Sequence, residues 1–219
     1  MIPSTNFSIN SFCGGYDNNF TYLVTCNHTG MQVLIDASFG LKKIVPYIRS
    51  HVSAVLITHS HSDHIQYLDQ YIKTYPNMVV FGHENSQNFS PKKIKPLKNN
   101  LKLKIGALVF KSIYTPGHYY DSICYQLNPI LFTGDTMFVG RTGRVISNKS
   151  NIKDLYSSIY DKILKMPLNT RIFPGHNYGK DSTITLKDNI RISPLLQATS
   201  LTDFEKKMED FEFSRTKQL

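Results

Sequence analysis

Three histidines and one aspartate stand within six residues, directly after an apolar run. The segment reads Val55-Leu56-Ile57-Thr58-His59-Ser60-His61-Ser62-Asp63-His64, and a helical pattern begins near Ile65. Imidazole nitrogens and carboxylate oxygens are ligands for divalent metals, and a strand end can present them with little loss of conformational entropy. Because the whole chain has only eight histidines, this concentration indicates a metal site that includes His59, His61, Asp63 and His64.

Three further candidate ligands share one local setting, in which each follows an apolar strand pattern and stands directly after a glycine. They are His118, Asp135 and His176, after the expected strands 108–114, 130–133 and 171–173. A single pair of this kind is typical of a turn. Four strand-end sites in one chain favour one shared metal centre. The remaining histidines are expected to be surface or packing residues: His28, His51 and His83.

The elements that must position these side chains alternate between strand and helix. Strand-like runs rich in β-branched and aromatic residues cover 20–25, 32–36, 54–58, 78–81, 108–114, 123–127, 130–133 and 171–173. Helical patterns cover 41–48, 65–75 and 151–165, and a helical tail of about 182–219 includes 187–191 and 203–211. This order predicts an α/β fold with central sheets and outer helices, in a single domain of 1–219.

Composition excludes several classes of protein. Hydrophobic residues make up 41% of the chain and charged residues 19%, which is typical of a folded domain and not of a disordered chain. No apolar run approaches the roughly 20 residues that span a bilayer, and the N-terminus lacks the pattern of a secretory signal. The three cysteines have no ligand-like spacing and cannot all pair. We therefore expect a cytoplasmic protein without a membrane partner, and nothing indicates an oligomeric state.

The net charge of +9 comes mainly from one stretch, in which six lysines occur without an acidic residue: Lys92, Lys93, Lys95, Lys98, Lys102 and Lys104. No aromatic residue lies among them, although stacking on single-stranded nucleic acid requires aromatic side chains. We expect a solvent-exposed connection and no specific nucleic-acid partner. The alternatives are steering of an anionic substrate and binding of a polyanion.

The order of the candidate ligands resembles that of the metallo-β-lactamase superfamily: His-x-His-x-Asp-His, a later His, an Asp in Thr-Gly-Asp, and a final His. The resemblance covers roughly residues 12–197. It implies an αβ/βα sandwich, with two mixed β-sheets, helices on the outer faces and the site at one edge. It also implies two divalent metal ions, with zinc expected first and iron or manganese as alternatives. His59, His61 and His118 would bind one ion and Asp63, His64 and His176 the other, with Asp135 as the bridge.

Three stretches, 14–23, 133–139 and 174–178, resemble glyoxalase II (hydroxyacylglutathione hydrolase) and persulfide dioxygenase. This resemblance implies a small-molecule substrate of the glutathione-conjugate type. Asp135 differs from β-lactamases that place a cysteine there, and the Ser60/Ser62 motif differs from the tRNA-processing branch. The chain departs from both relatives at 119–121 and at 141–146, where only the basic residue is kept. It is also too short for the C-terminal helical domain of the larger glyoxalase II enzymes.

The resemblance implies a metal-dependent hydrolase, in which a hydroxide held by the two cations attacks a thioester carbonyl. Asp63 and Asp135 would be catalytic because they fix the charge and orientation of the cluster, and Arg144 and Tyr178 would bind the substrate. The main alternative is a persulfide dioxygenase with a single non-haem iron on two histidines and Asp135. An RNA nuclease or a lactonase is a more remote alternative. A purely structural metal is disfavoured, because the site has two aspartates and no cysteine ligand.

Overall fold

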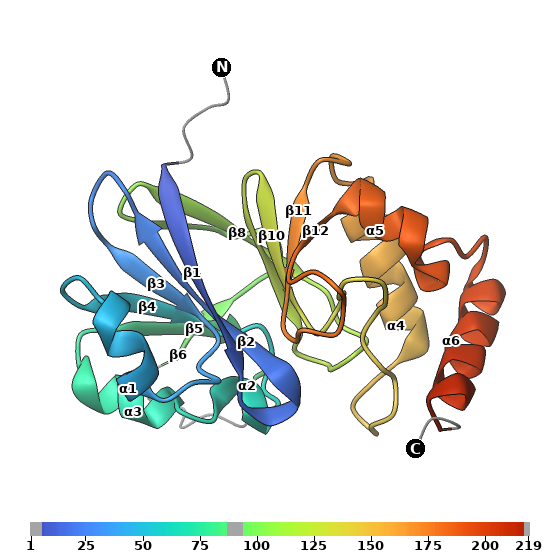
Figure 1. Cartoon of the computed structure of the whole chain (residues 1–219), viewed down its shortest axis with the longest axis horizontal. Helices are drawn as coiled ribbons and strands as arrows, with labels where there is room; N and C mark the ends of the chain where they lie inside the picture. The colour runs from blue at the N-terminus through green and yellow to red at the C-terminus, as the bar shows by residue number, and fades with distance from the viewer. Residues whose placement is uncertain (1–5, 87–93, 217–219) are drawn as a thin grey trace.

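Two six-stranded mixed sheets face one another in the computed structural model, which describes residues 6–86 and 94–216 (Figure 1). The first sheet has the order β1-β2-β3-β4-β5-β6, and its last three neighbouring pairs are parallel. Its strands are β1 (Phe7–Gly14), β2 (Asn19–Cys26), β3 (Gln32–Ile35), β4 (Val52–Leu56), β5 (Val79–His83) and β6 (Ile94–Leu97).

The second sheet has the order β12-β11-β10-β9-β8-β7, and only its β10–β11 pair is parallel. Its strands are β7 (Lys102–Ile105), β8 (Leu108–Tyr114), β9 (Ile123–Leu127), β10 (Ile130–Gly134), β11 (Arg171–Pro174) and β12 (Ile184–Thr185). Alternating apolar residues of both sheets fill the space between them, and the largest of these side chains are aromatic: Tyr22, Phe110, Tyr125 and Phe132.

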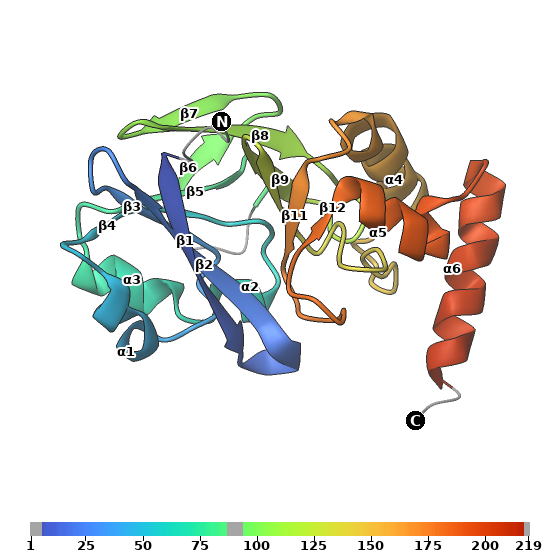
Figure 2. The same ribbon diagram turned by 45° about the horizontal axis from the view of Figure 1, so that its top comes forward.

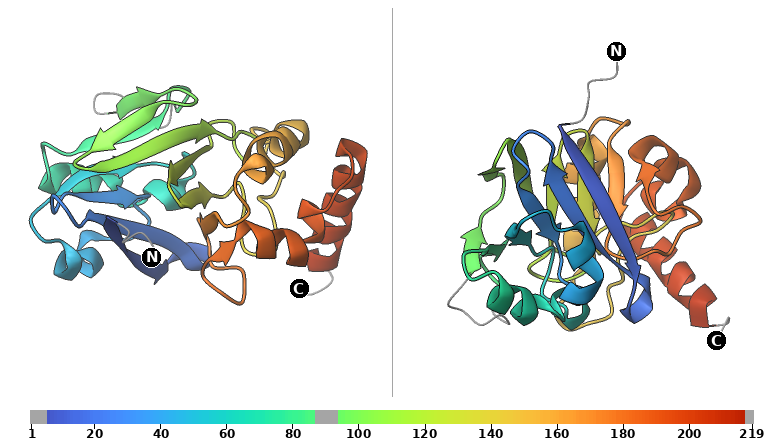
Figure 3. Two further views of the ribbon diagram at one scale, coloured as in Figure 1. Left: turned by 90° about the horizontal axis from the view of Figure 1, so that it is seen from above. Right: turned by 60° about the vertical axis from the view of Figure 1, so that its left-hand side comes forward.

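Helices cover the outer faces of the two sheets, on opposite sides of the molecule (Figures 2 and 3). The helices α1 (Leu41–Ile44), α2 (Ser62–Ile65) and α3 (Leu68–Thr74) lie on the side of the first sheet. The helices α4 (Ile152–Ser157), α5 (Leu186–Ile192) and α6 (Leu201–Thr216) lie on the side of the second. The predicted sandwich of two mixed sheets with outer helices is therefore confirmed.

The C-terminal tail packs against the rest of the second layer. Phe204 and Met208 of α6 are buried with Leu155 and Ile159, which belong to α4 and to the π-helical turn 158–162 that continues it. The side chain of Asn151 caps α4 by accepting from the amides of Lys153 and Asp154. No helix in the described ranges combines the length and apolar character that crossing a membrane requires.

The lysine-rich stretch is not a simple connection, so that prediction is wrong. Lys95 lies on β6, and Lys102 and Lys104 lie on β7, which are edge strands of the first and second sheet. These three side chains are exposed, as is Lys98 in the turn between the strands, whereas Lys92 and Lys93 lie outside the described residues. Charged side chains on an edge strand discourage pairing with another chain. A structural role therefore accounts for their concentration. The strands β1, β6, β7 and β12 were not predicted.

Candidate metal centre

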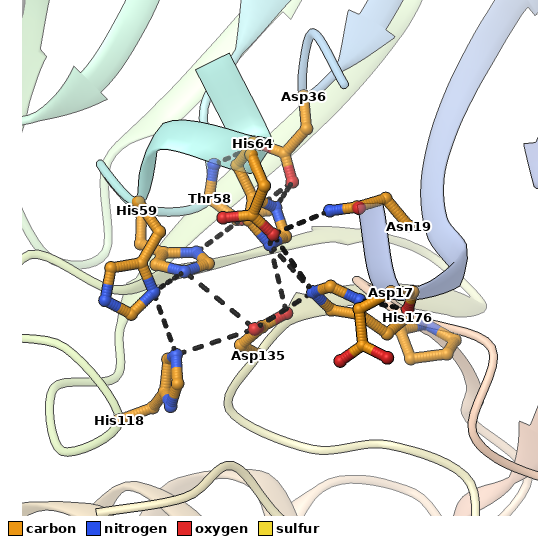
Figure 4. A network of polar contacts seen from close by, with 12 residues as sticks. Asp17, Asn19, Asp36, Thr58, His59, His64, His118, Asp135 and His176 are labelled. Atoms are coloured by element: carbon orange, nitrogen blue, oxygen red, sulfur yellow. Dashed lines mark hydrogen bonds and ion pairs between the residues drawn. The ribbon is translucent and has the colours of Figure 1, made fainter. Parts of the chain in front are cut away.

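All seven predicted ligands gather at one edge of the sandwich, where strands from both sheets end. Figure 4 labels five of them: His59, His64, His118, Asp135 and His176. His59 follows β4 of the first sheet, and Asp63 and His64 lie in the first turn of α2. The second sheet contributes the other three strand ends, because β8, β10 and β11 lead into His118, Asp135 and His176. The ligand atoms form two groups, each within 4.8 Å: His59, His61, His118 and Asp135, and Asp63, His64 and His176.

In the first group, His61 Nδ1 lies 2.8 Å from His59 Nε2 and 3.1 Å from His118 Nε2. Asp135 Oδ2 completes the group at 3.5 Å from His118 Nε2 and 4.0 Å from His59 Nε2. Ligand atoms about 2.1 Å from a tetrahedral zinc ion lie roughly 3.4 Å apart. These four atoms therefore have spacings that fit one cation.

In the second group, the Nε2 atoms of His64 and His176 lie 3.3 Å apart. Asp63 Oδ2 lies 3.6 Å from the first of these nitrogens and 3.4 Å from the second. Asp135 joins this group as well, since its Oδ1 is 3.3 Å from His64 Nε2 and its Oδ2 is 3.3 Å from His176 Nε2. One carboxylate thus contacts both groups, which is the geometry of a bridging ligand.

Hydrogen bonds on the far side of the rings fix which nitrogens face the centre. His64 Nδ1 donates to Asp36 Oδ2 at 2.8 Å, and His176 Nδ1 donates to the carbonyl of Asp17 at 2.8 Å, because both oxygens only accept. In the neutral rings both Nε2 atoms therefore carry lone pairs that point at each other. Two lone pairs cannot form a hydrogen bond, so this arrangement favours positive charge here, supplied either by a bound cation or by protons on the rings, since nearby carboxylates raise the pKa of both His64 and His176. The donor set fits a divalent metal.

Protonation of the cluster follows from burial and the nearby charges. Burial alone would lower the pKa of His64, but the carboxylates of Asp135 and Asp36 raise that pKa well above its usual value. Burial would raise the pKa of Asp135, but His64 and His176 hold it well below its usual value. Burial and then His118 lower the pKa of His61 to about 4. At neutral pH the carboxylate of Asp135 is ionised and His61 is neutral, as metal ligands must be.

Asp36, which the sequence did not single out, orients one histidine of each group. Besides His64, its Oδ2 accepts from Thr58 Oγ1 at 2.8 Å, and its Oδ1 accepts from the Thr58 amide at 2.7 Å. Since the Thr58 hydroxyl donates to Asp36, its oxygen is left to accept from His59 Nδ1 at 3.2 Å. Asp36 is only 2% exposed. The one available signal was that Asp36 is a charged residue at the end of the expected apolar strand 32–36.

The turn between β1 and β2 braces the second group from the side. Asn19 Nδ2 donates to Asp63 Oδ2 at 2.8 Å, and Asp17 supplies the carbonyl for His176. The Phe20 amide donates to the carbonyl of Gly175 at 2.7 Å, which holds the turn against the end of β11. Gly175 has no room for a side chain, because a Cβ there would lie 2.2 Å from Asp135 Oδ1.

The two predicted substrate residues lie beside the centre, but their side chains are already engaged. Arg144 Nε lies 2.9 Å and 3.0 Å from the two carboxylate oxygens of Glu212 on α6, while the Arg144 carbonyl accepts from His118 Nδ1 at 2.9 Å. The Tyr178 ring stacks on the His176 ring with centroids 5.0 Å apart and 3° between the planes. The Tyr178 hydroxyl donates to the Asp17 carboxylate. Their substrate role remains a prediction.

Arg141 is a second residue that the sequence did not reveal. Its guanidinium carbon lies 3.5 Å from the centroid of the Tyr178 ring, on a tyrosine that is itself stacked on His176. Its Nε is buried without a hydrogen-bond partner among the described residues. In contrast to Arg144, it has no ion pair within the described part of the chain. Arg141 is therefore a cation beside the centre that has no ion-pair partner among the described residues.

Replacing Asp36 tests whether it positions both groups. Asp36→Asn puts an amide donor where three donors now converge, so we expect zinc affinity to fall about 10- to 100-fold. Competition with a calibrated chelator measures this change, and circular dichroism checks that the fold persists. Asp69→Asn on α3 is the matched control, because that carboxylate lies outside the centre. Equal affinities for the two variants would show that Asp36 does not position the ligands.

Comparisons with known proteins agree with this geometry. The "Probable polyketide biosynthesis zinc-dependent hydrolase BaeB" of Bacillus velezensis is 26% identical and aligns over 91% of this chain and 88% of its own. The "Probable hydroxyacylglutathione hydrolase glo2" of Schizosaccharomyces pombe is 28% identical, over 89% of this chain and 77% of its own. The crystal structure of ETHE1 from Myxococcus xanthus has a TM-score of 0.82 at 27% identity, and the match covers 93% of this chain and 91% of that one.

The family model described as "Metallo-beta-lactamase superfamily" matches residues 14–176. This range is more than half of the chain and includes all seven candidate ligands. The chain belongs to the metallo-beta-lactamase superfamily.

Proposed function

We propose that this chain is a metal-dependent hydrolase that cleaves a thioester. The proposal is supported by relatives that are named hydroxyacylglutathione hydrolase. The observation that carries the proposal is the position of Asp135, whose two oxygens lie 3.3 Å from ligand nitrogens of the second group while one also faces the first. A carboxylate placed between two groups of ligands suits a pair of cations. We further propose that His59, His61, His118, Asp63, His64 and His176 hold this pair and that both ions are zinc.

Two bound divalent cations would activate water and polarise the substrate carbonyl near neutral pH. In the proposed reaction, water adds to the thioester carbonyl and the carbon–sulfur bond breaks, which releases a carboxylic acid and a thiol. The chain contributes the charge and orientation of the cluster. Asp135 and Asp63 supply two negative charges, and Asn19 holds Asp63 in place through a hydrogen bond of 2.8 Å. Asp63 and Asp135 are the proposed catalytic residues on these grounds.

The second candidate is a persulfide dioxygenase with one iron ion. The overall likeness to ETHE1 favours it as strongly as the relatives favour the hydrolase. In that case only His59, His118 and Asp135 bind the metal. The second group would then keep two nitrogen lone pairs 3.3 Å apart with only a proton between them, next to the carboxylate of Asp63. Asp63, His64 and His176 would then converge without binding a metal, and this convergence of three ligand side chains is the reason to prefer two cations and the hydrolase.

For the substrate we propose a thioester whose thiol carrier is anionic, such as a glutathione conjugate. Arg141 is the proposed contact for that anion, in place of Arg144. Arg144 uses Nε and Nη2 on the carboxylate of Glu212, whereas the guanidinium of Arg141 lies over the Tyr178 ring and its Nε has no hydrogen-bond partner among the described residues. A stacked guanidinium keeps its edge free to bind a carboxylate. Tyr178 then acts as the platform between Arg141 and His176.

Metal exchange separates the two functions. The protein is stripped with a chelator and reloaded with zinc or, without oxygen, with ferrous iron. Each form is assayed anaerobically for hydrolysis of S-lactoylglutathione and aerobically for oxygen uptake with glutathione persulfide. We expect hydrolysis to disappear in the stripped protein and to return with two metal ions per chain. Oxygen uptake by the iron form, with no hydrolysis in any metal form, would establish the dioxygenase instead.

Arginine variants test the anion contact. Arg141→Met keeps the apolar contact with Tyr178 but removes the charge, so KM for S-lactoylglutathione should rise about 10-fold while kcat changes less than about twofold, as for uniform binding. Arg144→Met should leave KM nearly unchanged and lower thermal stability, because Glu212 loses its partner. Steady-state kinetics and thermal denaturation of both variants measure these effects. The opposite ranking of KM would identify Arg144 as the substrate contact.

A further inference from the structure

The metal centre opens to solvent through a pocket of about 360 Å³. Two of the predicted ligands, His61 and Asp63, line this pocket together with Tyr16, Ser62 and Gln66. A substrate that reaches the centre from this side must therefore pass between Tyr16 in the β1–β2 turn and Gln66 after α2.

A larger hollow of about 770 Å³ adjoins this opening and shares Tyr16 and Gln66 with it. The hollow leads away from the metal ligands, and its other lining residues include Ser38, Phe39, Lys42, Lys43 and Tyr67. Since Tyr16 and Gln66 line both spaces, the opening and the hollow are neighbours, and we treat the two together as one groove. We call it the lysine groove, because its far part carries Lys42 and Lys43.

The walls of the lysine groove combine aromatic surface with unpaired polar groups. Tyr16 is 71% exposed and Tyr67 is 36% exposed, so both rings offer apolar surface to a ligand. Ser38 is only 3% exposed, and its hydroxyl has no hydrogen-bond partner among the described residues. Buried hydroxyls are normally paired. This hydroxyl is therefore an available contact for a ligand that lies in the groove.

Two ammonium groups provide the charge in this groove. Lys43 Nζ lies 4.8 Å from the centroid of the Phe39 ring, and neither Lys42 nor Lys43 forms an ion pair with a described carboxylate. Aromatic walls followed by two cations match an elongated molecule with an apolar body and an anionic end.

We propose that the lysine groove binds the acyl part of the substrate, and that this acyl part is a chain that ends in a carboxylate. The proposal rests on the thioester hydrolysis proposed above. The carbonyl carbon of a thioester carries two substituents, the acyl chain and the sulfur of the thiol carrier, and these extend in different directions. The proposed thiol-carrier contact, Arg141, lies beyond Tyr178 and His176, whereas the groove starts at His61 and Asp63. The acyl chain is therefore the substituent that the groove receives.

A matched pair of substrates tests the proposal. Adipoyl and hexanoyl thioesters of N-acetylcysteamine have chains of equal length, and only the adipoyl chain ends in a carboxylate. We expect the wild type to have a KM about 10-fold lower for the adipoyl ester. The double variant Lys42→Gln/Lys43→Gln should remove this preference by raising KM for the adipoyl ester about 10-fold. Lys73→Gln/Lys165→Gln removes two exposed charges outside the groove and should keep the preference.

The shape of the groove is tested separately through Tyr16. In a series of unbranched acyl thioesters, KM should fall with chain length in the wild type, and this dependence should weaken in Tyr16→Ala. Equal KM values for the adipoyl and hexanoyl esters in the wild type, or loss of the preference in the Lys73/Lys165 control, would overturn the proposal.

A direct binding measurement distinguishes failure of the groove from failure of the hydrolase. The probe is the thioether analogue of the adipoyl ester, in which a methylene group replaces the carbonyl, and calorimetry measures its Kd. Binding that weakens about 10-fold in Lys42→Gln/Lys43→Gln supports the groove even if no thioester is hydrolysed. Equal binding by the wild type and this variant contradicts the groove, whatever the activity of the enzyme.

Discussion

The carboxylate of Asp135 is a buried charge, 7% exposed, that lies among histidines contributed by both sheets. A buried carboxylate is stable only when positive charge and hydrogen bonds replace the water that it has lost. His64 approaches it from the first sheet, and His118 and His176 approach it from the second. This requirement for compensating charge joins the two halves of the sandwich at one edge, and it places the cations of the proposed reaction there.

Two hydrogen bonds between the sheets hold them in a fixed relative position at this edge. Tyr22 of the first sheet donates from its hydroxyl to the carbonyl of Pro174 in the second, at 2.6 Å. Tyr125 of the second sheet donates to the carbonyl of Ile57 in the first, at 2.7 Å. Each bond ends two residues before a candidate ligand, at Pro174 before His176 and at Ile57 before His59. Buried cross-sheet hydrogen bonds therefore fix the strand ends from which the ligands project.

The seven candidate ligands could be predicted from the sequence because each is marked locally, by an apolar strand before it and a short turn around it. The residues that orient them carry no such mark. Asp36 acts on Thr58 and His64, which are 22 and 28 residues away in the chain, and the Asp17 carbonyl acts on His176 across 159 residues. Only the folded chain brings these partners together.

Long-range pairing also explains what could not be predicted. The sequence singled out Arg144 as a substrate contact, but it carried no sign that Glu212, 68 residues away, binds its guanidinium. Arg141 gains its place on Tyr178 only when the loop after β10 meets the end of β11. The lysine-rich strands β6 and β7 each contain a single β-branched residue, Ile94 or Ile105, and no aromatic residue, so the usual composition of a strand is weak in these two edge strands.

Anomalous X-ray diffraction at the zinc edge, from crystals grown with zinc, tests the central claim that this edge holds two cations. We expect two anomalous peaks about 3.5–4 Å apart, as in other two-metal sites. One peak should lie among His59, His61 and His118, the other among Asp63, His64 and His176, with Asp135 between them. A single peak at His59, His118 and Asp135, with the second group empty at saturating zinc, would contradict the two-cation account.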